Sequence, residues 1–193
     1  MCVTGILYVL LIYFVGIKNK GIIYNIQIIK YSILIPLLLI AFITDLKKKI
    51  IPNRLSLTIF EIGLIFVFIY GTFNINLAIN MILGMVIGGC IFLLIAILGK
   101  VFSKKEAMGL GDIKLTIGLG LFFGAMNITI ISILSFFIAA IVSIFLLVTK
   151  RKKMSDYIAF APFIVIASFL IIFIPSDIIT EILLNIFSFV TYL

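Results

Sequence analysis

The sequence contains no histidine and only two cysteines, Cys2 and Cys90, which lie far apart within apolar stretches. It therefore has neither a CxxC pair nor an imidazole, which excludes a zinc site built from the usual sulfur and nitrogen ligands. Acidic residues are also scarce, with seven Asp and Glu against fifteen Lys and Arg. We interpret both cysteines as packing residues.

Apolar residues are abundant instead, at 65% of the chain, with 11% charged residues and a mean hydropathy of +1.45. So much apolar surface cannot be buried inside a water-soluble globule. Because hydrocarbon contains no water, and because the apolar runs do not alternate with polar residues, helices are favoured over barrel strands. The sequence predicts an all-α, polytopic transmembrane helical bundle with about six to eight spans, forming a single membrane domain over residues 1–193.

The apolar runs between polar breaks predict about eight segments, near residues 3–17, 31–45, 55–73, 77–99, 113–124, 127–149, 157–174 and 178–193. The run 113–124 is shorter than the roughly 20 residues of a span, so it is either a half-helix or a span that begins in the preceding loop. The last run either spans or lies at the interface. Gly84 with Gly88, and Gly120 with Gly124, form GxxxG pairs that mark either helix contacts or ordinary membrane-helix glycines.

The basic residues indicate the orientation of these segments. If the loops after residues 45, 99 and 149 share one side of the membrane, only Lys18, Lys20 and Lys30 face the other side. By the positive-inside rule the basic side is the cytoplasmic side of the cell membrane, so the net charge of +8 reflects topology and not nucleic-acid binding. The basic side holds Lys47, Lys48, Lys49, Arg54, Lys100, Lys104, Lys105, Lys114, Lys150, Arg151, Lys152 and Lys153.

Two acids fall at the cytoplasmic ends of predicted helices, Asp45 and Asp112. Asp112 lies in the string Gly109-Leu110-Gly111-Asp112-Ile113-Lys114. A charge beside flexible backbone at membrane depth is a functional-site hypothesis. The structural alternatives are a helix-end acid paired with a lysine for Asp45 and a helix cap for Asp112. Lys114 either orients a carboxylate or extends its ammonium group to the membrane surface.

Two neighbouring aspartates can hydrolyse a peptide bond. One carboxylate takes a proton from water and the other, protonated, donates to the scissile carbonyl oxygen. The pair shares a proton, because two close carboxylates do not both ionise readily. Gly109 and Gly111 lack Cβ atoms and would leave room for an extended substrate strand. Glu61, about two turns inside the third segment, either tunes such a site or pairs with a buried cation.

Four pieces of the chain occur in an order that is typical of one protein family. They are Asp45 followed by Ile51-Pro52-Asn53, the glycine-rich stretch Gly84 to Gly89, the string from Glu106 to Leu115, and Phe160-Ala161-Pro162-Phe163. Over residues 45–163 the chain therefore resembles the type IV prepilin peptidase family of GxGD aspartic membrane proteases. The family usually has glycine at the position of Ala161, a departure from which we expect little consequence.

The resemblance implies that Asp45 and Asp112 are the catalytic pair, that Gly109, Gly111 and Lys114 form the substrate-binding part of the site, and that no metal or other cofactor is needed. Substrates would be prepilin-like proteins, cut after a glycine at the cytoplasmic face to release a short basic leader. Larger members also methylate the new N-terminus through a region with paired CxxC motifs. This chain lacks such motifs, so we expect a compact, peptidase-only form. The lipid bilayer and a second copy of the chain are further expected partners.

Two rival functions fit parts of the pattern. In a transporter, Asp45 and Asp112 would carry a cation or proton, but both lie at a predicted helix end and not at the midplane. Presenilin-type intramembrane proteases contain the same Gly-Leu-Gly-Asp string. They pair it with a Tyr-Asp motif and a Pro-Ala-Leu segment, whereas this chain has Thr44-Asp45 and Phe160-Ala161-Pro162-Phe163. The prepilin branch is therefore favoured.

Overall fold

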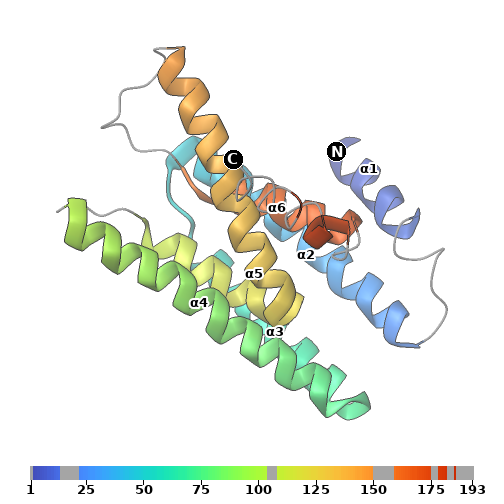
Figure 1. Ribbon diagram of the computed structural model, residues 1–193. Coiled ribbons are helices and arrows are strands. Elements are labelled where there is room, and N and C mark those ends of the chain that lie inside the picture. The colour runs from blue at the N-terminus through green and yellow to red at the C-terminus, as the bar shows by residue number, and fades with distance from the viewer. Residues whose placement is uncertain are drawn as a thin grey trace.

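The protein is a helical bundle in a computed structural model that describes residues 2–13, 22–103, 108–149, 159–174, 178–181 and 185. The bundle confirms the predicted all-α membrane architecture. Four of its helices are long and apolar enough to cross a membrane, over Asn25–Lys48, Asn53–Phe73, Ile75–Val101 and Leu110–Val148. The elements, shown in Figure 1, are α1 (Cys2–Leu11), α2 (Ile22–Lys48), α3 (Asn53–Phe73), α4 (Ile75–Ser103), α5 (Leu110–Val148) and α6 (Ala161–Phe173).

The helix boundaries agree with the predicted segments in the middle of the chain and differ elsewhere. Helices α3 and α4 correspond to the runs 55–73 and 77–99, and the runs 113–124 and 127–149 are the two legs of a single bent helix, α5. Helix α2 begins at Ile22 and not near residue 31, so Lys30 belongs to the helix and not to a loop. The last predicted run, 178–193, lies mostly outside the described residues.

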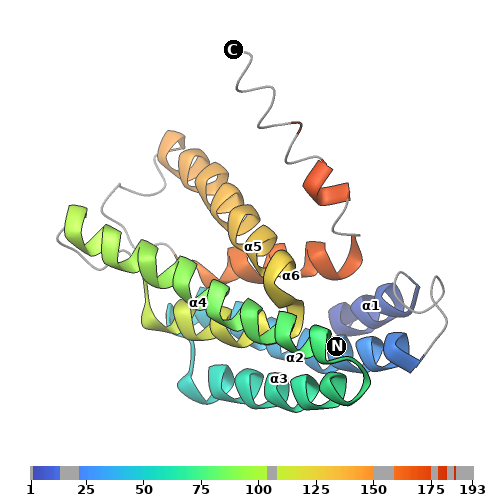
Figure 2. The same cartoon turned by 60° about the horizontal axis from the view of Figure 1, so that its bottom comes forward.

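Short connections set the direction of the helices. Residues 49–52 join α2 to α3, and Asn74 alone joins α3 to α4. The N–H of Asn74 donates to the Tyr70 carbonyl at 2.8 Å and its Oδ1 accepts the N–H of Asn76 at 2.9 Å, so one residue caps both helices. Links this short make consecutive helices antiparallel. The ends of α2 and α4 and the starts of α3 and α5 therefore meet at one end of the bundle, as Figure 2 also shows.

Helices α4 and α5 form the most extensive contact in the bundle. A Cβ atom added to Gly84 would lie 2.5 Å from the carbonyl oxygen of Gly120, and one added to Gly88 would lie 2.9 Å from that of Thr116. Both GxxxG pairs thus lie at one interface, where the missing side chains let the two backbones touch. This contact fixes the leg of α5 that begins at the predicted site.

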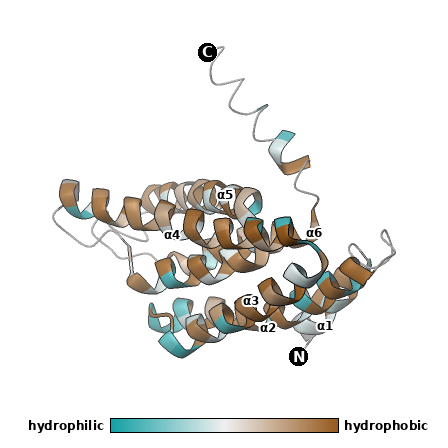
Figure 3. Cartoon of the chain, turned by 90° about the horizontal axis from the view of Figure 1, so that it is seen from below, coloured by the Kyte–Doolittle hydropathy of each residue, from teal (hydrophilic) through white to brown (hydrophobic). Residues whose placement is uncertain are grey.

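The outer surface of the bundle is apolar. Large side chains such as Phe68, which is 82% exposed, point outward and suit a lipid environment. Hydrophilic positions gather where α2 leads into α3, a region that includes Lys47, Lys49 and Arg54 (Figure 3). Cys90 is also exposed, which corrects its interpretation as a packing residue.

The bend in α5 occurs at Gly124, whose φ of 77° and ψ of 175° are not helical. A bend of this kind frees backbone groups that must find other partners in an apolar environment. Lys30 Nζ donates to the Phe122 carbonyl at 2.7 Å, and Asn80 Oδ1 accepts the N–H of Ala125 at 3.3 Å. The Lys30 ammonium also lies 4.9 Å from the ring centroid of Tyr31. Lys30, predicted to face the side of the membrane opposite the basic loops, is buried against the bend.

Removal of the Lys30 amine is expected to destabilise the bend. In Lys30→Met the apolar stem is retained while the Phe122 carbonyl loses its donor, which costs about 1–3 kcal/mol for a buried acceptor. The midpoint of thermal unfolding in detergent should fall accordingly. Lys48→Met, which alters an exposed lysine at the other end of the same helix, is the control. Equal midpoints for the two variants would contradict this role of Lys30.

Candidate active site

The structure brings Asp45 and Asp112 to the same cavity, which has a volume of about 330 Å³. Both side chains are only 3% exposed. One wall is the connection from α2 to α3, residues 49–53, and the other is the start of α5 with the residue before it, 109–112. The alternating helix directions explain this meeting, because the end of α2 and the start of α5 lie at the same end of the bundle.

Asp45 is held by the first residue of α6. The main-chain N–H of Ala161 donates to Asp45 Oδ2 at 3.0 Å. An N–H in the first turn of a helix has no partner within that helix, and the helix N-terminus favours negative charge. In the sequence, the segment from Phe160 to Phe163 stands out only as part of a family pattern, whereas the structure shows its contact with the site. Because the donor is main chain, either alanine or glycine can provide it at position 161.

The wall that follows Asp45 begins with a residue in an unusual conformation. Lys49 has a φ of 52°, in the left-handed region that few residues other than glycine adopt. Its N–H donates to the carbonyl of Asp45 at 2.8 Å, which closes the last turn of α2. The chain then turns along the cavity through Ile50, Ile51 and Pro52. Such strain of about 1–3 kcal/mol is typical of functional sites.

Gly111 lies against this wall. A Cβ atom at position 111 would be 3.1 Å from the Cβ of Ile51, closer than most side chains approach one another. The absence of a side chain at position 111 therefore allows the two walls of the cavity to pack closely. Gly109 and Gly111 also line the cavity, where a substrate strand could reach them. Their contact with a substrate stays a prediction.

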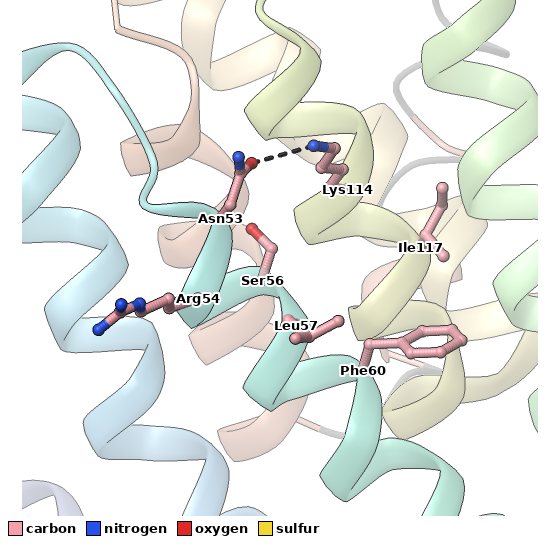
Figure 4. Close-up of a pocket in the computed structure, with 7 residues that line it drawn as sticks. All are labelled: Asn53, Arg54, Ser56, Leu57, Phe60, Lys114 and Ile117. Atoms are coloured by element: carbon pink, nitrogen blue, oxygen red, sulfur yellow. Dashed lines mark hydrogen bonds between the residues drawn. The ribbon is translucent and has the colours of Figure 1, made fainter.

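Lys114 extends from the first turns of α5 to the start of α3. Its Nζ donates to Asn53 Oδ1 at 3.0 Å, as the dashed line in Figure 4 shows. Asn53 also lines the cavity of the two acids, so this hydrogen bond ties one wall to the helix that contains Asp112. Neither alternative considered for Lys114, a bond to a carboxylate or extension to the membrane surface, describes this contact.

Glu61 is not part of this arrangement. Its side chain is exposed on α3, and it is absent from the residues that line the cavity. Within the described residues no three His, Cys, Asp or Glu side chains lie together as a metal site would require. What the cavity offers chemically is a pair of carboxyl groups, one able to donate a proton and the other to accept one.

Comparison with known proteins connects this geometry to a family. The sequence profile of the type IV leader peptidase family matches residues 32–144, a stretch that includes Asp45 and Asp112. The chain belongs to the type IV leader peptidase family. The cavity of this leader peptidase family member thus lies inside the segment that defines the family.

Curated relatives within the leader peptidase family are named prepilin leader peptidase/N-methyltransferase. The protein from Aeromonas hydrophila is 29% identical over 65% of this chain and 42% of its own length. The one from Xanthomonas campestris pv. campestris is 30% identical over 70% of this chain and 46% of its own length. The one from Legionella pneumophila is 28% identical over 81% and 53%. The chain spans about half the length of these relatives, and no solved structure matches it.

Proposed function

We propose that the chain is a membrane-embedded aspartic endopeptidase that removes the short leader of prepilin-like proteins. The meeting of Asp45 and Asp112 in one cavity is the observation that carries this proposal. Membership of the leader peptidase family and the names of the curated relatives support the substrate class. The proposal concerns peptide-bond cleavage alone.

In the proposed reaction the scissile peptide lies in the cavity between the two walls. One carboxylate takes a proton from a water molecule, whose oxygen attacks the carbonyl carbon. The other carboxyl group donates its proton to the carbonyl oxygen, and collapse of the tetrahedral intermediate breaks the C–N bond as the leaving amine takes a proton. Gly109 and Gly111 flank the path of the substrate, and the bond from Lys114 to Asn53 holds the walls in register.

We place the active site at the cytoplasmic face of the cell membrane, with cleavage after a glycine. The basic side chains at the end of α2 and the start of α3 lie at the same end of the bundle as the acids, which supports this orientation. Lys104, Lys105 and residues 150–153, which contribute to the predicted charge asymmetry, lie outside the described residues.

The direct experiment mixes membranes that contain the full chain with a prepilin-like substrate made of a short basic leader, a glycine and an apolar helix. We expect a shortened product whose N-terminal sequencing begins immediately after the glycine. A substrate in which a bulky residue replaces that glycine is the control and should stay uncut. An intact substrate after incubation with well-folded enzyme would contradict the proposed function.

A further inference from the structure

Another cavity, of about 390 Å³, lies between α3 and α5 beside the cavity of the two acids. Its polar residues gather at one end, with Asn53, Arg54 and Ser56 at the start of α3 and Lys114 on α5. Leu57, Phe60 and Ile117 give it an apolar floor (Figure 4). We call this space the α3/α5 groove. Its polar mouth is at the end of the bundle where the basic side chains gather, and its apolar floor continues toward the middle of α3.

The hydroxyl group of Ser56 is the unusual feature of the groove. Ser56 is 4% exposed, and its Oγ is the buried side-chain polar atom that finds no hydrogen-bond partner in the described part of the chain. Other buried hydroxyl groups, such as that of Ser132, donate to the carbonyl one turn earlier. An unpaired buried hydroxyl is costly and calls for a partner from outside the chain. Ser56 lines the groove, and in Figure 4 its Oγ points toward the end where Asn53 and Lys114 meet.

Lys114 and the N-terminus of α3 bring positive charge to the end of the groove that holds this hydroxyl. Helix α3 starts at Asn53 with no side-chain cap and no acid in its first turn, so its N-terminal N–H groups and its dipole favour an anion. Lys114 uses one ammonium proton on Asn53 and has two others to donate. Arg54 is adjacent, but its guanidinium group extends away from Lys114 in Figure 4. The groove therefore combines a hydroxyl, an ammonium and a helix N-terminus above an apolar surface.

We propose that the α3/α5 groove binds an anionic phospholipid. The phosphate accepts hydrogen bonds from Ser56 and Lys114, and one acyl chain lies over Leu57, Phe60 and Ile117. Charge complementarity favours this occupant over a zwitterionic lipid. The same charges would repel the basic leader of a substrate, so we do not expect the leader to bind in this groove. Asn53 and Lys114 also join the walls of the cavity of the two acids, but the binding of a lipid in the groove does not depend on the proposed function.

The test measures lipid binding to the full chain, purified in detergent, by native mass spectrometry. Phosphatidylglycerol and phosphatidylcholine with the same acyl chains are the probes. We expect one tightly bound phosphatidylglycerol, with a Kd raised about tenfold in Ser56→Ala and in Lys114→Gln. Lys48→Gln removes an exposed charge at the same end of the bundle and should change Kd less than twofold. Ser56→Ala keeps the test informative if Lys114→Gln does not fold.

Several results would overturn the proposal. Equal affinity for the two lipids, or an effect of Lys48→Gln as large as that of Ser56→Ala, would indicate a nonspecific lipid shell. Binding of inorganic phosphate as tight as that of phosphatidylglycerol would indicate an anion site that makes no use of the apolar floor. A photoreactive benzophenone residue at position 60 should crosslink phosphatidylglycerol. If it captured only a prepilin-like substrate in membranes containing both, the groove would belong to the substrate.

Discussion

Asp45→Asn and Asp112→Asn are each expected to abolish cleavage of a prepilin-like substrate. The side-chain amide has nearly the same shape as the carboxyl group but can neither accept the proton of water nor donate an acidic one. Loss of general acid or base catalysis lowers a rate by about 10²- to 10⁴-fold. The measurement is the rate of leader release from substrate in membranes, with enzyme amounts matched by immunoblot.

The structure predicts that both variants still fold. An amide at position 45 keeps an oxygen that can accept the N–H of Ala161, so the contact with α6 survives. The bond from the main-chain N–H of Asp112 to the Gly109 carbonyl does not involve the altered side chain. Thermal unfolding close to that of the unaltered protein is therefore expected, which separates a catalytic defect from a folding defect.

A matched control comes from Glu61→Gln. This change also converts a carboxyl group to an amide in a membrane helix, but Glu61 is exposed and does not line the cavity. Cleavage by this variant should be close to that of the unaltered protein. The double variant at positions 45 and 112 should be no slower than either single variant, because residues that act as a unit are not additive. Substantial cleavage by either single aspartate variant would exclude the proposed pair.

The sequence could predict that the two acids share one end of the bundle. Each acid follows or begins an apolar run, and alternating helix directions are enough to bring Asp45 and Asp112 to one side. It could not predict how Asp45 is held. The donor is the main-chain N–H of Ala161, 116 residues away, and a main-chain group has no side-chain pattern that reveals it. Gly111 is similar, since its neighbour Ile51 becomes visible only when the two walls are placed together.

Lys30 illustrates a different limit. A lysine near the edge of an apolar run is usually at the membrane surface, and the polar breaks in the sequence predict that the second segment starts near residue 31, just after Lys30. Its partner is the carbonyl of Phe122, 92 residues later, which is available because α5 bends at Gly124. The break between the runs 113–124 and 127–149 was visible in the sequence. The sequence does not reveal that the Phe122 carbonyl accepts a hydrogen bond from Lys30, because this contact depends on how α2 packs against the bend.

Gly84→Ala and Gly120→Ala are expected to cause the largest losses of stability. A Cβ atom at position 84 would lie 2.5 Å from the Gly120 carbonyl oxygen and 2.6 Å from the carbonyl carbon of Gly124. Backbone atoms cannot rotate away as side chains do, so the two helices must separate. Overpacking typically costs about 1–3 kcal/mol, and contact with backbone places these variants near the upper end, about 3 kcal/mol. Thermal unfolding in detergent measures the change.

Gly5→Ala is the matched control. A Cβ atom at position 5 would have no neighbouring atom within 4 Å, so the same substitution there should not lower the midpoint of unfolding and could raise it slightly. Replacement of glycine by alanine also favours a helix in itself, by about 1 kcal/mol. A lower unfolding midpoint for the variants at positions 84 and 120, but not for the variant at position 5, therefore reports the contact between α4 and α5. Equal midpoints for all three variants would show that the two backbones do not approach closely.

The same variants should also reduce cleavage, even at temperatures where they remain folded. Gly120 and Asp112 lie on the same leg of α5, before the bend at Gly124. When α4 pushes this leg away, Asp112 moves with it relative to Asp45, which is held separately by α6. A displacement of about 1 Å at a catalytic group can lower a rate by about 100-fold. Full activity in a folded Gly120→Ala protein would mean that the cavity tolerates this movement, and that precise spacing of the two carboxyl groups is not what limits cleavage.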